Sequence, residues 1–130
     1  MTAAGGPLDP DSALDYLQNW QGRIERMAAD TQAMSDRLGE LRVSAEDGDG
    51  IVAVTIDSTG VLADLRFTER VQRIAPDASS RAVLTALRAA RLKAAERSRQ
   101  IIEETVGPDS IAGRTIAERM EQQLNGGSEA

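Results

Sequence analysis

Apolar residues recur every three and four positions between Leu17 and Leu41, and this spacing constrains the fold more than any other feature of the chain. A heptad repeat sustained for about four heptads predicts a long helix with a seam that packs against another helix. A helix from Pro10 to Leu38 would be roughly 43 Å long, more than a chain of this size can cover, so part of it should project or pair with a second subunit. The two lines of the seam are Leu17, Ile24, Thr31 and Leu38, and Trp20, Met27, Met34 and Leu41.

The expected helix begins at Asp9, which we predict as the N-cap, with Pro10 at the first helical position. Trp20 and Gly22 match the W-x-G tripeptide that forms the turn of the helical-hairpin substrates of type VII secretion. Here the helical pattern continues past Gly22, so we expect Trp20 to lie within the helix, in a core or at an interface.

After Leu41 the helical spacing gives way to alternation, which is typical of strands. We expect a weak edge strand over 41–46, a strand over 51–57 and a return strand over 61–67. Asp-Gly pairs at 47–50 favour a hairpin turn, because they tolerate positive φ. An EF-hand calcium loop starting there would need Gly and Glu where Val52 and Ser58 stand, so the sequence predicts a turn and no metal site.

A second long helix should follow a short connection at 69–74 that is ended by Pro76. Asp77 or Ser79 is the expected cap, and Gly107-Pro108 should stop the helix at about Val106. Its alanines would permit close approach to a neighbouring element. The expected inward stripe consists of Val83, Leu87, Ala90, Ala94 and Ile101.

The remaining segments divide the chain into one domain with appendages. We expect a disordered N-terminus at 1–8, a domain at 9–106, a helical extension at 107–124 and a disordered tail at 125–130. The extension would be capped by Asp109 or Ser110. Its apolar side would be formed by Ile116, Met120 and Leu124.

The hairpin text Gly50-Ile-Val-Ala-Val-Thr-Ile-Asp-Ser-Thr-Gly60-Val-Leu-Ala-Asp-Leu-Arg66, between two long helices, resembles the YbaB/EbfC family of small bacterial nucleoid-associated proteins. The resemblance covers roughly residues 11 to 106. It implies a two-layer α+β fold, and a homodimer with projecting helices that binds DNA with little sequence preference.

A small three-stranded sheet is a second reason to expect a dimer. The chain's own helices can cover one face, whereas the other face would still carry Ile51 and Ala53, and a lone core is thin at this size. We therefore predict a homodimer with the sheet at its centre. The predicted interface residues are Ile51, Ala53, Val61, Leu65 and Phe67.

The composition argues against catalysis. The chain has no Cys and no His, which removes the common zinc ligands, the thiol nucleophile and the usual general base of a hydrolytic triad. It also lacks a glycine-rich phosphate loop. We expect no enzyme activity, no cofactor and no metal. Without a leader or a run of 18 apolar residues, the cytoplasm is the expected location, and the resemblance adds the nucleoid.

Charge is distributed unevenly along the chain. The net charge is −6, yet residues 51–100 carry nine basic and five acidic side chains. On the second helix Arg81, Arg88 and Arg99 fall close together at about 100° per residue, away from the apolar stripe. Phosphate groups of DNA would bind such a ridge. The predicted DNA-binding residues are Arg81, Arg88, Arg91, Lys93, Arg97 and Arg99.

Two alternatives stay open. The basic side chains could instead form a solvated face that pairs with acidic residues of the first helix, such as Asp30, Asp36 and Glu40. The protein could also be a YbaB-like interaction module, for example a secretion-associated one, that docks a protein partner through its first helix. A sequence pI of about 4.7 suits this second alternative. Together with the resemblance, the basic helix favours a nucleoid-associated protein.

Overall fold

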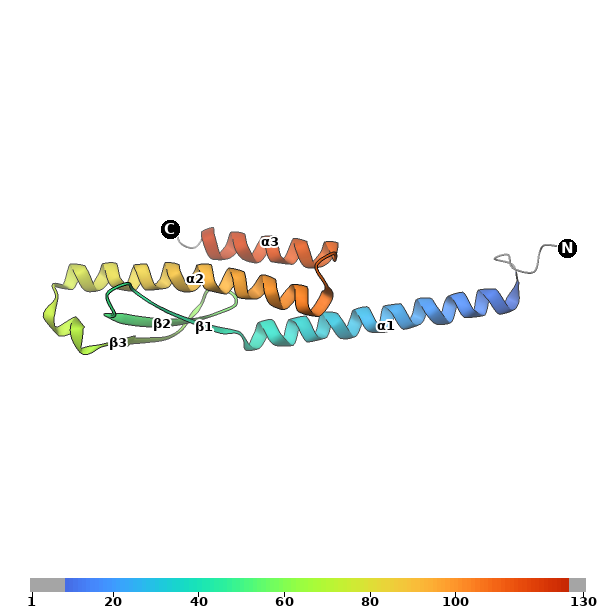
Figure 1. Ribbon diagram of the computed structural model, residues 1–130, viewed down its shortest axis with the longest axis horizontal. Helices are drawn as coiled ribbons and strands as arrows, with labels where there is room; N and C mark the ends of the chain where they lie inside the picture. The colour runs from blue at the N-terminus through green and yellow to red at the C-terminus, as the bar shows by residue number, and fades with distance from the viewer. Residues whose placement is uncertain (1–8, 127–130) are drawn as a thin grey trace.

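A computed structural model describes residues 9–126 and shows a small two-layer body from which one helix projects (Figure 1). The α+β class and the order of the elements are as predicted. The described residues include Asn125 and Gly126, which belong to the last helix, whereas the ends at 1–8 and 127–130 lie outside the described residues. The elements are α1 (Pro10–Glu40), β1 (Arg42–Glu46), β2 (Val52–Asp57), β3 (Leu62–Phe67), the 3-10 helix η1 (Glu69–Arg73), α2 (Pro76–Val106) and α3 (Ile111–Gly126).

The strands form an antiparallel sheet in the order β1-β2-β3, and α2 lies across one face of it. The main contacts of the helix are with β1 and β2, and it has few or none with β3. Val52, Val54 and Ile56 of β2 point towards α2 and are fully buried. The helix-facing side of β3 is therefore covered only in part: Leu65 is half-buried, whereas Leu62 and Phe67 are about half exposed.

Alanines at every fourth position bring α2 close to the sheet. Ala82, Ala86, Ala90 and Ala94 are buried, and the small side chains leave room for the valines and isoleucine of β2. The predicted stripe was partly wrong at its start, because Val83 is only partly buried at the edge of the contact. Leu87 likewise lies on the flank of the stripe.

The register of β3 differs from simple alternation. Phe67 pairs with Val52 and Leu65 with Val54, so both point to the helix side, but a bulge beside Ile56 then brings Leu62 onto that side as well. The expectation that Ile51 lies on an uncovered outer face is wrong. Ile51 precedes β2 and is only 8% exposed, in the core of its own subunit.

Helix α1 projects away from the body for most of its length (Figure 1). Only Met34 of this helix is buried, where α1 meets the end of α2. Trp20 lies in mid-helix and is 50% exposed, so the W-x-G turn is ruled out and the tryptophan is not a core residue of this subunit. The long helix forms as predicted, but of the two predicted seam lines only Met34 is buried, and Leu41 lies beyond the end of the helix.

Asp9 is the N-cap of α1 and Pro10 its first residue, as predicted, whereas the predicted cap of α2 is wrong. The Asp9 side chain accepts a hydrogen bond from the Ser12 hydroxyl (3.0 Å) and none from a backbone N–H. Pro76 does not end the connection but is the first residue of α2, whose cap is Ala75. The prediction for α3 was right, since Ser110 Oγ accepts from the N–H of Gly113 (3.0 Å).

Helix α3 turns back along α2 and is anchored at both ends (Figure 1). Near its start, a Cβ on Gly113 would lie 2.8 Å from a methyl group of Val106, so only glycine allows this approach. Near its end, Leu124 is 1% exposed and belongs to the main core, next to Gly60 in the turn between β2 and β3. The C-terminal extension thus packs as part of the body.

Candidate nucleic-acid interface

Positive charge concentrates in the helix layer at the end of the body remote from α1. Residues 69–93, which cover η1 and the first half of α2, carry six basic and two acidic side chains, a net charge of +4. Residues 10–40 carry three arginines and six carboxylates, a net charge of −3. Since α1 leads away from the opposite end of the body, the molecule is polarised along its length (Figure 1).

Two of the predicted DNA-binding residues are free to bind a ligand. Arg81 and Arg88 lie on the outward side of α2 and are exposed. Neither forms an ion pair or a side-chain hydrogen bond with any residue in 9–126. The guanidinium groups of both therefore face solvent without a neutralising carboxylate, which is the state in which a cation gains most from binding phosphate.

Arg91 and Lys93 lie on opposite flanks of the same helix. The Nε of Arg91 is 3.9 Å from the position that a Cβ on Gly60 would occupy, so this half-buried arginine borders the β2–β3 turn. Lys93 Nζ donates to the backbone oxygen of Ser44 in β1 (2.8 Å). Lys93 thus helps to hold α2 on the sheet and is not part of one ridge with the arginines.

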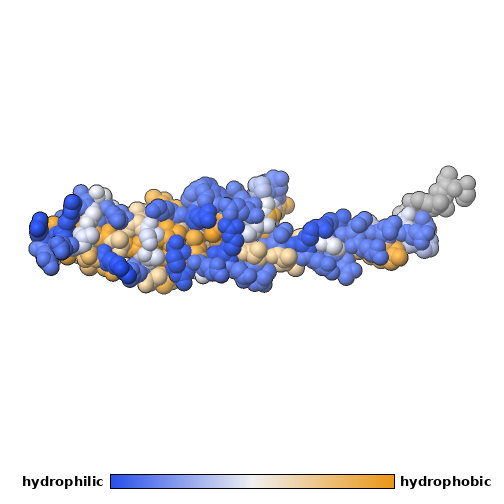
Figure 2. Space-filling view, turned by 60° about the horizontal axis from the view of Figure 1, so that its bottom comes forward, coloured by the Kyte–Doolittle hydropathy of each residue, from blue (hydrophilic) through white to orange (hydrophobic). Residues whose placement is uncertain are grey.

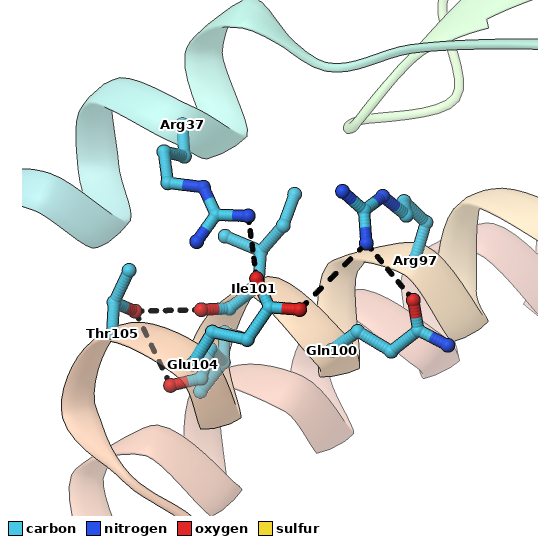
Figure 3. Close-up of polar contacts among 7 residues, drawn as sticks. Arg37, Arg97, Gln100, Ile101, Glu104 and Thr105 are labelled. Atoms are coloured by element: carbon cyan, nitrogen blue, oxygen red, sulfur yellow. Dashed lines mark hydrogen bonds and ion pairs between the residues drawn. The ribbon is translucent and has the colours of Figure 1, made fainter.

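Arg97 belongs to an ion-pair cluster that joins α1 to α2 (Figure 3). Glu104 accepts from Arg37 of α1 (2.6 Å) and lies 3.9 Å from Arg97, which also donates to Gln100 (3.0 Å). The hydrogen bond from Arg37, with the charges of both arginines, lowers the pKa of Glu104. The cluster neutralises Arg97 in part, but its carboxylate belongs to α2 and its second arginine to α1. The alternative pairing of basic residues with Asp30, Asp36 and Glu40 is therefore not seen within residues 9–126.

Arg99 is the predicted residue whose surroundings favour phosphate least. It forms an ion pair with Glu96, and α3 packs beside it. Glu118 and Glu121 of α3 line the same surface hollows as Arg99. The predicted ridge is therefore split: α3 covers the outward side of α2 around Arg99, whereas Arg81 and Arg88 lie beyond the end of α3.

Sequence reasoning missed Arg73, which is exposed at the end of η1 and forms no ion pair within the described part of the chain. It was overlooked because the ridge was sought on one helix only. The signal was available, since Arg70 and Arg73 precede α2 by a few residues within the same positive segment. Arg70 is less free, because its Nη1 donates to the backbone oxygen of Asp49 (2.8 Å).

In each of the two hairpin turns, an aspartate carboxylate accepts hydrogen bonds from backbone N–H groups of the turn. Burial tends to raise the pKa of Asp47, but hydrogen bonds from backbone N–H groups, including those of Val52 (2.9 Å) and Ile51 (2.8 Å), outweigh it and lower the pKa. Asp57 accepts from the hydroxyl and the N–H of Thr59, which lowers its pKa as well. No group of His, Cys, Asp and Glu side chains in 9–126 could hold a metal ion.

Comparison with known proteins gives one clear result. No curated protein matches the chain. None of the helices in the described part is long and apolar enough to cross a membrane. The model of the YbaB/EbfC DNA-binding family matches residues 15–108, which comprise nearly all of α1, the sheet, η1 and α2 but not α3. With most of its length matched and the expected order of elements present, the chain belongs to the YbaB/EbfC DNA-binding family.

Proposed function

We propose that this protein binds duplex DNA as a homodimer, largely without sequence specificity, and acts as a nucleoid-associated protein in the bacterial cytoplasm. The observation that carries the proposal is the pair of exposed, unpaired guanidinium groups of Arg81 and Arg88 in a chain of a DNA-binding family. Arginines that neutralise phosphates release counterions from DNA, and this contribution does not depend on base sequence.

The charge distribution sets the direction from which DNA would approach. The net charge of −3 on α1 would repel phosphate, and so would the acidic side of α3 beside Arg99. The segment 69–93 is the part of the chain with a clear positive excess. DNA therefore meets η1 and the first half of α2, with Arg73, Arg81 and Arg88 contacting the sugar-phosphate backbone and Arg91 at the margin.

The uncovered side of β3 supports the homodimer. Among the predicted interface residues, Phe67 is 47% exposed and Leu65 is half-buried on the helix side of β3, although α2 covers the neighbouring strand β2. Val61 is 60% exposed, but it is adjacent to Leu62 and lies on the other face of the sheet. Ala53 lies on the opposite, mostly polar face, and Ile51 is buried. An exposed apolar strand next to a packed helix is a surface that a second copy would cover.

The test is a gel-shift titration with random-sequence duplex at about 50 mM and about 150 mM salt. The wild type should bind at low salt and more weakly at high salt. Arg81→Ala with Arg88→Ala should weaken binding at least about tenfold on every sequence and reduce the salt slope by roughly one per lost phosphate contact.

The matched control is Arg26→Ala with Arg119→Ala, which removes the same charge from exposed arginines of α1 and α3. It should lose much less affinity, because neither residue lies in the positive segment. Equal losses in the two double variants would mean that net charge alone governs binding. If duplex stays free even at low salt, DNA binding is refuted.

The protein-interaction module remains a second candidate because of one observation. Large apolar side chains of α1, among them Leu17, Trp20 and Met27, are half exposed or more on the projecting helix. A helix of this kind can bind a partner protein. A protein that leaves duplex free in the gel shift, but binds another protein through α1, would fit this candidate.

A further inference from the structure

An apolar hollow of about 500 Å³ lies at the C-terminal end of α2, between α1 and α3. Both flanking helices pack on α2, but they have few or no contacts with each other, so the space between them stays open. We name this surface the junction groove. Its apolar lining consists of Met27 and Met34 of α1, Val106 of α2, and Ile111, Ala112 and Ile116 of α3.

The edges of the junction groove expose large apolar side chains to water. Ile111, the first residue of α3, is 79% exposed, and Met27 is 64% exposed. Trp20 and Ile24 extend the apolar surface along α1, because residues three, four or seven positions from Met27 share its helix face. Both are about half exposed. Figure 2 shows apolar side chains where α1 leaves the body, beside the mostly hydrophilic surface of the projecting helix.

The charges around the junction groove are mainly negative. Asp30 and Asp109 line the hollow together with the apolar residues. Asp30 is exposed and forms no ion pair with any residue in 9–126, and Asp109 has only a 3.7 Å contact with Arg114. Helix α1 has a net charge of −3, and residues 101–126, with two arginines and five carboxylates, also have a net charge of −3. The groove therefore favours a positively charged ligand.

The junction groove is an addition to the unit that defines the family. The family match ends at residue 108, whereas Ile111, Ala112 and Ile116 belong to α3. A drug-sized ligand usually has 70–90% of its surface buried in its site. Since Met27 and Ile111 are mostly exposed, the groove is too open for such a ligand and suits an elongated one that also covers α1.

The helices of this chain are poor occupants of the groove. A second α1 would bring a net charge of −3 against the same charge, and like charges across an interface oppose binding. Helix α2 is basic, but its apolar side is buried on the sheet. Helix α3 has no net charge, and its Leu124 is in the core. Within residues 9–126 there is thus no basic helix with a free apolar face.

We propose that the junction groove binds an amphipathic helix of a partner protein, with Lys or Arg beside its apolar side chains. Apolar anchors at i, i+3 or i+4, and i+7 of that helix fill the hollow, which is how amphipathic helices bind grooves. Its basic side chains reach Asp30 and Asp109. The surface of α1 from Trp20 to Met34 is about 21 Å long and matches about 14 residues of the bound helix. The inference does not rest on DNA binding, because the positive segment 69–93 lies at the other end of the body.

Three labelled peptides of about 18 residues, built from Leu, Ala and one charged residue, test the proposal by fluorescence anisotropy. The first is a basic amphipathic helix with Lys, the second has Glu in place of every Lys, and the third is a scrambled form of the first. The basic amphipathic peptide should bind the full chain at least about tenfold more tightly than either of the others. Equal binding of the scrambled or the acidic peptide, or no binding of any, would overturn the proposal.

Variants locate the binding surface. Met27→Ser with Ile111→Ser should weaken binding of the basic peptide at least about tenfold, because both remove exposed anchors of the groove. Leu92→Ser is the matched control, since Leu92 is 65% exposed on α2 and does not line the groove. It should change the affinity less than about twofold. Equal losses in the two proteins would place the peptide elsewhere and refute the site.

The contribution of charge has its own pair of variants. Asp30→Asn with Asp109→Asn should weaken the basic peptide several-fold, whereas Asp64→Asn with Asp77→Asn should not. The second pair is matched, because it also combines an exposed aspartate that contacts an arginine with an exposed one that has no ion pair in the described part of the chain. Equal effects of the two pairs would mean that net charge alone attracts the peptide.

The emission of Trp20, the single tryptophan, reports whether the bound helix extends along α1. An unlabelled peptide without tryptophan should shift the emission to shorter wavelength, and a bound peptide that leaves it unchanged would contradict this path. The Met27→Ser and Ile111→Ser protein should keep its sedimentation and its gel shift. A change from dimer to monomer in this variant would show that a second copy occupies the groove and would overturn the inference, whereas a failed gel shift of the wild type would affect only DNA binding.

Discussion

Replacing Asp47 by Ala should destabilise the protein by about 3 kcal/mol, because this carboxylate satisfies the buried turn between β1 and β2. Its Oδ1 accepts from the N–H groups of Ile51 (2.8 Å) and Val52 (2.9 Å), both buried. Alanine would leave two donors without a partner, at about 1–3 kcal/mol each. Urea unfolding followed by circular dichroism should show a lower midpoint, by about 1.5 M for a slope of about 2 kcal/mol/M.

Two further variants and the pH dependence of stability test whether the loss comes from the Asp47 carboxylate. Asp47→Asn keeps one acceptor oxygen and should lose less than half as much stability, whereas Asp49→Ala, in the exposed part of the same turn, should stay within about 0.5 kcal/mol of the wild type. Because the pKa of Asp47 is lowered in the folded state, its contribution is complete above the unfolded pKa near 3.9. It should fade as the pH falls through that value towards the folded pKa, and less so in Asp47→Asn. An Asp47→Ala loss no larger than that of Asp49→Ala would refute the reasoning.

Three further predictions concern α3. Two test how it docks on the body, and one tests how its charge affects DNA binding. Leu124→Ala should cost about 3 kcal/mol in urea unfolding, since the side chain is 1% exposed. Gly60→Ala should cost at least about 1 kcal/mol in the same assay, because the residue has φ of +89° and a Cβ would lie 3.2 Å from Leu124. Glu118→Gln with Glu121→Gln should strengthen DNA binding several-fold in the gel shift, because it removes two negative charges beside Arg99.

Leu92 supplies the control for the stability measurements. It lies on α2 and is exposed, so Leu92→Ala should change stability by less than about 1 kcal/mol. If Leu124→Ala and Leu92→Ala cost the same, α3 is not anchored in the core. Unchanged affinity after the two glutamate replacements would show that α3 does not weaken the interface.

Local patterns allowed most of the elements to be predicted. The heptad spacing identified α1, alternation identified the strands, and Gly107-Pro108 marked the end of α2, because each pattern reflects the geometry of a single element. Errors arose where two elements meet. The bulge beside Ile56 and the burial of Ile51 depend on how β3 and η1 pack, and one inserted residue changes which side chains share a face.

The candidate interface was less accessible to sequence reasoning. A helical wheel places Arg81, Arg88 and Arg99 together, but it cannot show that α3 returns to the side of Arg99 or that Lys93 bonds to β1. Arg97 is likewise neutralised in part by Glu104. Glu104 also binds Arg37 of α1, which lies 67 positions earlier in the chain. Ion pairs between distant segments are not visible in spacing.

The sequence by itself determined the types and order of the elements, the family and the presence of a basic segment, because these follow from the periodicity, turn residues and charges of contiguous stretches. Only the tertiary structure decided which arginines stay free and which apolar residues stay uncovered. Both depend on what lies next to a side chain in space: α2 covers two strands out of three, α3 covers one end of the basic helix, and α1 extends beyond the body.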